Sequence, residues 1–135
     1  LNGSKITTYD IRMKKPNIEP CVDVAAMHTL EHIIATYLRN NAQWKDSIIY
    51  WGPMGCLTGN YLLMKGDLES KDIVELMQET FRFVAEFEGE VPGTAPKDCG
   101  NYLLHDLPMA KWESAKYLHE VLEQMTEDNL VYPSK

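Results

Sequence analysis

The chain has few cysteines, no surplus of basic residues and no long apolar run, and each of these features excludes a class of protein. Its three cysteines, Cys21, Cys56 and Cys99, are too few for a scaffold built on disulfides. Lysine and arginine number 13 against 20 aspartates and glutamates, a formal net charge of −7, which disfavours binding to the nucleic-acid backbone. The longest apolar stretch, Ile48–Leu57, contains Pro53 and two glycines, so no membrane span is predicted.

The sequence also contains no internal repeat or low-complexity tract, and it shows no recognisable secretory signal at its start. Its 135 residues, of which 44% are hydrophobic, are enough for one globular domain with a buried core. A small and odd number of cysteines favours a reducing compartment, where thiols stay free, although one disulfide and one spare thiol would give the same count. We therefore expect a single cytoplasmic domain over residues 1–135.

Residue patterns predict a fold of mixed strands and helices. Apolar residues recur at helical spacing in three segments, and Asp23 and Ser70 are suited to begin two of them. Segments rich in β-branched and aromatic residues predict strands. Because strands and helices do not alternate regularly, we expect an α+β fold with an antiparallel sheet packed against helices. The expected strands are Lys5–Met13, Ile48–Trp51 and Leu57–Met64; the expected helices are Met27–Leu38, Lys71–Phe87 and one after Asp106.

The most specific motif is His28-Thr29-Leu30-Glu31-His32, within the first expected helix. Residues four apart share a helix face, so the two histidines can bind one divalent metal ion through their ring nitrogens. Glu31 is close enough to act as a general acid or base at the open side of that ion. The alternative is that these two histidines and the glutamate are ordinary surface residues of a helix, and the apolar residues around the motif disfavour it.

A catalytic metal site of this kind needs a third protein ligand. Cys99 is the best candidate, because it follows a loop rich in proline and glycine and precedes Gly100. A thiolate and two imidazoles leave a fourth position for water or substrate. A buried cysteine that packs as a small apolar residue explains Cys99 equally well. His105 and His119 are weaker metal candidates, and His119 is expected to face solvent.

A second thiol, Cys56, lies in a glycine-rich bend between two expected strands, Gly52-Pro53-Met54-Gly55-Cys56-Leu57-Thr58-Gly59. A nearby divalent cation would lower the pKa of this thiol and give a thiolate able to move protons near neutral pH. A tight hairpin that simply accommodates a cysteine is the alternative, and the pattern alone leaves both open.

Four ordered segments together resemble the S-ribosylhomocysteine lyase (LuxS) family. They span nearly the whole chain, in the order and at separations similar to those of the family. The segments are Asp10-Ile11-Arg12, His28-Thr29-Leu30-Glu31-His32, Gly52-Pro53-Met54-Gly55-Cys56 with Thr58-Gly59, and Cys99-Gly100 followed by His105-Asp106-Leu107.

The resemblance implies an enzyme that splits S-ribosylhomocysteine into homocysteine and dihydroxypentanedione, the precursor of autoinducer-2 in quorum sensing. It implies a homodimeric α+β fold with one divalent metal per subunit at the interface, usually Fe(II), with Zn or Co able to substitute. The residues that match the family's functional positions are the metal ligands His28, His32 and Cys99, the acid/base residues Cys56 and Glu31, and the substrate contacts Arg12 and Arg39.

The chain departs from the family pattern in two respects. Family members usually carry about two dozen further residues before the first matched strand, so the family's N-terminal segment is expected to be missing here. Leu57 and Asn60 stand where a polar and an aromatic residue are usual, and Tyr50 stands where many members have an acidic one. Two other functions fit the motif: a metallopeptidase with an inverted HxxEH motif, or a degenerate metal-binding domain without catalysis.

Overall fold

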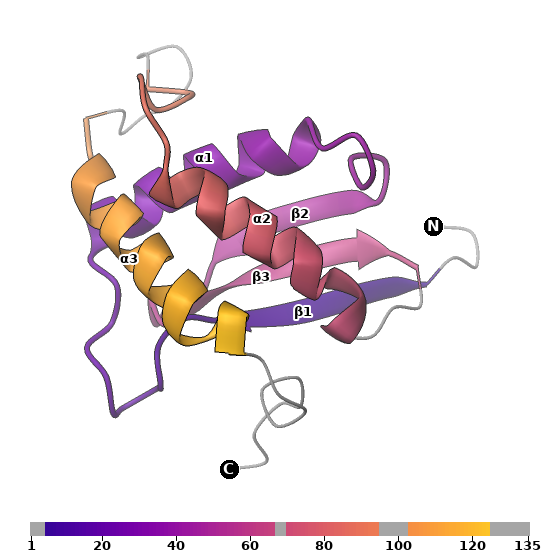
Figure 1. Ribbon diagram of the computed structural model, residues 1–135, viewed down its shortest axis with the longest axis horizontal. Helices are drawn as coiled ribbons and strands as arrows, with labels where there is room; N and C mark the ends of the chain where they lie inside the picture. The colour runs from indigo at the N-terminus through magenta and orange to yellow at the C-terminus, as the bar shows by residue number, and fades with distance from the viewer. Residues whose placement is uncertain (1–4, 67–69, 95–102, 125–135) are drawn as a thin grey trace.

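A computed structural model describes residues 5–66, 70–94 and 103–124 of the chain. It has the expected α+β fold, in which three antiparallel strands form one sheet and three α-helices lie on one face of it (Figure 1). In chain order the elements are β1 (Ile6–Arg12), α1 (Val24–Arg39), β2 (Ile48–Pro53), β3 (Gly59–Lys65), the 3₁₀ turn η1 (Ser70–Ile73), α2 (Val74–Ala85), α3 (Leu107–Glu120) and the 3₁₀ turn η2 (Leu122–Gln124).

The sheet has the strand order β1-β3-β2, so β3 is central and pairs antiparallel with both neighbours. The hairpin from β2 to β3 was expected, but β2 continues through Pro53, and the turn begins later than the predicted turn at Gly52. Gly59 begins β3 at a point where a Cβ atom would lie 2.4 Å from the carbonyl oxygen of Ile11. Glycine at that position therefore allows β1 and β3 to approach each other closely.

The helix ends follow from capping chemistry in two of three cases. The Asp23 carboxylate accepts a hydrogen bond from the Ala25 amide at the start of α1, and Asp106 accepts one from Met109 at the start of α3. The prediction that Ser70 caps a helix beginning at Lys71 is wrong. A 3₁₀ turn precedes α2, whose N-cap is Ile73, with no side-chain hydrogen bond at the cap.

The core lies between the sheet and the helices and anchors α1 firmly. Met27, Leu30 and Ile34 of α1 are at most 1% exposed, as their helical spacing predicted. The opposite face of the sheet is different, because several large apolar side chains remain exposed on or beside it, among them Ile6, Ile49, Tyr50 and Tyr61. Within the described ranges no helix has the length and apolar character that crossing a membrane requires.

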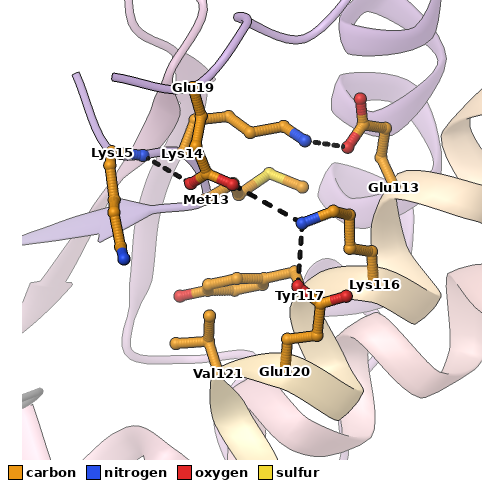
Figure 2. A pocket seen from close by; sticks show the side chains of 9 residues that line it. All are labelled: Met13, Lys14, Lys15, Glu19, Glu113, Lys116, Tyr117, Glu120 and Val121. Carbon is orange, nitrogen blue, oxygen red and sulfur yellow. Dashed lines mark hydrogen bonds and ion pairs between the residues drawn. The ribbon is translucent and has the colours of Figure 1, made fainter. Parts of the chain in front are cut away.

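An ion pair with little solvent exposure ties the end of β1 to α3. The Lys14 ammonium lies 2.6 Å from Glu113 Oε1, and both side chains are less than 10% exposed (Figure 2). The ammonium also lies 5.7 Å from the ring centroid of Trp112, within the range of a cation–π contact. The ion pair and the contact with Trp112 hold α3 against the end of β1. They thereby also hold the residues just before α3, which reach the site described next.

Candidate metal centre

Two histidines of α1 face each other across one helical turn. The Nε2 atoms of His28 and His32 are 3.0 Å apart, and the two rings are nearly perpendicular, at 89°. The expectation that the HxxEH spacing brings two imidazoles together is confirmed.

Each of these rings is oriented by a backbone carbonyl on its other nitrogen. His28 Nδ1 lies 2.6 Å from the carbonyl oxygen of Leu104, and His32 Nδ1 lies 2.8 Å from that of Pro92. Because a carbonyl oxygen can only accept, the neutral rings carry their protons on Nδ1 and present lone pairs at Nε2. Two lone pairs that face each other are stabilised by a cation placed between them.

The Pro92 carbonyl reaches His32 because the following residue is a glycine. Gly93 has a φ of +72°, in the left-handed region, and a Cβ atom there would lie 2.8 Å from His32 Nδ1. A larger residue would meet both backbone strain and a clash with the ring.

The pair fits a divalent transition metal. Imidazole nitrogen is a good ligand for iron and zinc, and metal-binding histidines commonly donate their other N–H to a backbone carbonyl, as both rings do here. A tetrahedral ion with bonds of about 2.0–2.1 Å separates two nitrogens by roughly 3.3 Å, so the pair needs to open by only a few tenths of an ångström.

His105 completes a group of three imidazoles, although the sequence ranked it as a weaker candidate. One nitrogen from each ring, of His28, His32 and His105, lies within 4.8 Å of the others. The ring of His105 stacks on that of His28, with centroids 4.2 Å apart and planes 17° apart. Burial, and then the nearby His28 and His32, lower the pKa of His105, which favours a neutral ring. The signals in the sequence were its place just before Asp106, which caps α3, and its position in the fourth matched segment, His105-Asp106-Leu107.

The other candidate residues are placed as follows. Cys99 lies outside the described residues, so its role as third ligand stays a prediction. Glu31 is partly exposed on α1, next to His32, and Arg39 is exposed in the last turn of the same helix. His119 is 64% exposed and contacts Glu123, so its expected position facing solvent is confirmed.

Cys56 belongs to a second polar group at the turn between β2 and β3. The Arg12 guanidinium forms an ion pair with Asp10 and donates a hydrogen bond to Thr58 Oγ1, 2.9 Å away. The same hydroxyl lies 2.9 Å from Cys56 Sγ. Hydrogen bonds from Thr58, together with the positive charge of Arg12, lower the pKa of the exposed Cys56 thiol. Thr58 was not identified as a functional residue from the sequence, although it is only two positions from Cys56.

Comparison with known proteins gives matches along nearly the whole chain. The model of the S-ribosylhomocysteinase (LuxS) family matches residues 1–128. A protein of Phocaeicola vulgatus named S-ribosylhomocysteine lyase is 77% identical over 135 residues, which are 100% of this chain and 84% of the relative. A protein of the same name from Porphyromonas gingivalis is 65% identical over 133 residues, which are 98% of this chain and 84% of the relative. Another, from Clostridium beijerinckii, is 54% identical over 129 residues, which are 96% of this chain and 81% of the relative. The chain therefore belongs to the S-ribosylhomocysteinase (LuxS) family.

Proposed function

We propose that this protein cleaves S-ribosylhomocysteine into homocysteine and dihydroxypentanedione, as a metal-dependent carbon–sulfur lyase. Its membership of the LuxS family and the names of its relatives support this reaction. The observation that carries the proposal is the facing pair of Nε2 atoms of His28 and His32, each prepared for a metal by a carbonyl on Nδ1.

His28, His32 and Cys99 are the proposed ligands of one divalent ion per subunit, Fe(II) in the first place, with Zn or Co as substitutes. Two imidazoles and a thiolate suit these ions, and they leave room for a sugar oxygen. When bound, the ion supplies Lewis acidity toward a carbonyl of the sugar chain.

Cys56 and Glu31 are the proposed proton carriers. The Cys56 thiolate takes a proton from a carbon beside the carbonyl, and Glu31 moves protons at the neighbouring position, so that the carbonyl migrates along the sugar chain. In the last step a C–H bond and the C–S bond break, a C=C bond forms, and homocysteine leaves as a thiolate that then takes a proton. The hydrogen bond of Thr58 to Cys56 supports this role, because it favours the thiolate.

Arg12 and Arg39 are the proposed substrate contacts. Their guanidinium groups are suited to hold the carboxylate or hydroxyl groups of the substrate. Arg12 contacts Asp10 and Thr58, and these contacts orient it beside Cys56.

A homodimer with its active site at the interface is the proposed assembly. In the antiparallel register Asp10 lies opposite Tyr61, so both side chains point to the same face of the sheet. The polar group of Asp10, Arg12, Cys56 and Thr58 (the Arg12–Cys56 group) therefore borders the exposed aromatic side chains of that face. A second subunit could cover both the group and these side chains. The free Cys21 and Cys56 thiols support a cytoplasmic protein.

The test combines metal analysis with product release. Protein purified without oxygen is analysed for bound metal, then given S-ribosylhomocysteine while free homocysteine thiol is measured. We expect metal and thiol release in the wild type; Cys56→Ala should keep the metal and lose release. Normal homocysteine release by Cys56→Ala would contradict the role of that thiol, and a metal-loaded wild type that releases no thiol would contradict the proposed function.

A further inference from the structure

Thr29, the residue after His28, connects α1 to the segment that precedes α3. Its side chain is fully buried, and its hydroxyl has three contacts within hydrogen-bond distance. It donates to the carbonyl of Ala25 at 3.1 Å, accepts from the Asp106 amide at 2.9 Å, and lies 2.9 Å from His105 Nδ1. One hydroxyl hydrogen and two lone pairs satisfy all three contacts only if His105 donates from Nδ1. Thr29 therefore fixes both the position and the tautomer of His105.

Two consecutive residues of this segment then hold the ring of His28. The carbonyl of Leu104 accepts from its Nδ1, and the ring of His105 lies flat against its face. Contacts on an edge and on a face together fix the direction of the His28 Nε2 lone pair.

The same stacking argues against His105 as a ligand beside His28. An imidazole lone pair lies in the plane of its ring, and the planes of His28 and His105 are only 17° apart. Lone pairs in two nearly parallel, stacked planes converge poorly on one ion, whereas those of the perpendicular rings of His28 and His32 converge well. The Nε2 atom of His105 is nevertheless buried, without a hydrogen-bond partner among the described residues.

We propose that Thr29 and His105 are positioning residues that fix the ring of His28 for metal binding. The proposal rests on the metal site of the proposed function and adds two residues to it. It concerns affinity for the metal and the geometry around it, so it can be tested without turnover.

The experiment measures Co(II) affinity and the visible absorption of the Co(II)-loaded protein for variants of both residues. Thr29→Val removes the hydroxyl and keeps the shape, and we expect its metal affinity to fall about 10- to 100-fold, as for other groups that orient metal ligands. Thr29→Ser restores the hydroxyl and should bind nearly as the wild type does. His105→Phe keeps a flat ring on His28 but loses the bond to Thr29, so we expect a smaller loss than for His105→Ala.

Thr80 provides a matched control. It is also a fully buried helical threonine, and its hydroxyl donates to the carbonyl four residues earlier, Leu76, at 2.7 Å. Thr80→Val should therefore lose a comparable hydrogen bond while leaving Co(II) affinity and spectrum unchanged. Circular dichroism of the metal-free variants establishes that each is folded.

Three results would overturn the proposal. Unchanged affinity and spectrum in folded Thr29→Val and His105→Ala would remove the positioning role, and so would an equal loss in Thr80→Val. Loss of metal in His105→Ala as complete as in His28→Ala would make His105 a ligand instead. A wild type that binds Co(II) but releases no homocysteine would count against the proposed function alone and leave this inference standing.

Discussion

At the scale of single residues, the chemistry of Cys56 depends on a hydroxyl two positions away. Thr58 accepts from Arg12 and lies within hydrogen-bond distance of the sulfur, so its own hydrogen is available to the thiolate. We predict that Thr58→Val raises the pKa of Cys56 toward its ordinary value, so that the thiolate forms only at a higher pH than in the wild type. The measurement is the rate of Cys56 alkylation against pH, read by peptide mass spectrometry, and the midpoint should move upward.

Thr58→Ser is the matched control for this change, because it keeps the hydroxyl. Its alkylation profile should stay close to that of the wild type, and the profile of Cys21, which is also exposed, should not change in either variant. Identical midpoints for Cys56 in Thr58→Val and the wild type would show that the hydroxyl does not stabilise the thiolate.

The sequence revealed the local part of the site but not the contact between Thr29 and His105. His28 and His32 are four residues apart on one helix, so their meeting follows from helix geometry alone. Thr29 and His105 are 76 positions apart, and no local pattern indicates that α3 begins against α1. Orientation by the backbone carbonyls of Leu104 and Pro92 was equally hidden, because a carbonyl is present at every residue.

At the scale of elements, residue patterns identified the three α-helices and three strands of the described residues, and errors occurred at the ends. Asp23 was recognisable as a cap, and a helix was expected after Asp106; the carboxylates of both residues accept from amides in the first turn of their helices. At α2 the chain makes a 3₁₀ turn over Ser70–Ile73 first, and the same residue types allow either kind of turn.

The ion pair between the end of β1 and α3 leads to a prediction about stability. Glu113→Gln keeps the size of the side chain but leaves the Lys14 ammonium, 7% exposed, without its counter-charge. Breaking a buried pair in this way costs about 3–5 kcal/mol, so we expect the free energy of unfolding to fall by that order. Urea unfolding followed by circular dichroism measures the loss, and the double variant Lys14→Met/Glu113→Gln should recover much of it.

A surface pair on the same helix serves as the comparison. Lys116 lies 2.8 Å from Glu120, but the Glu120 side chain is 62% exposed, so water replaces the interaction readily. Glu120→Gln should therefore change the unfolding midpoint much less than Glu113→Gln. Equal midpoints for Glu113→Gln and the wild type would contradict the importance assigned to the buried pair.

At the scale of the whole molecule, the helices cover one face of the sheet (Figure 1). Large side chains remain exposed at the other face. Tyr50 and Tyr61 are 50% and 42% exposed, and the register places Tyr61 opposite Gly52, two residues from Tyr50. Neighbouring exposed aromatic side chains commonly mark a surface that binds a partner. The proposed homodimer would cover this surface with its copy from a second subunit, since a two-fold interface uses the same patch on both sides.

This assembly predicts the effect of a charge in the middle of the patch. Tyr61→Glu would place two carboxylates near each other in a closed dimer, so we expect light scattering to give the mass of a monomer for this variant and of a dimer for the wild type. Phe83→Glu is the matched control, because Phe83 is 40% exposed on α2, on the helical side of the sheet, and should leave the dimer intact. Tyr61→Glu should lose homocysteine release together with the dimer, because the Arg12–Cys56 group borders the same face. A wild type that is monomeric at every concentration tested, or a monomeric Tyr61→Glu with full release, would contradict an active site shared between two subunits.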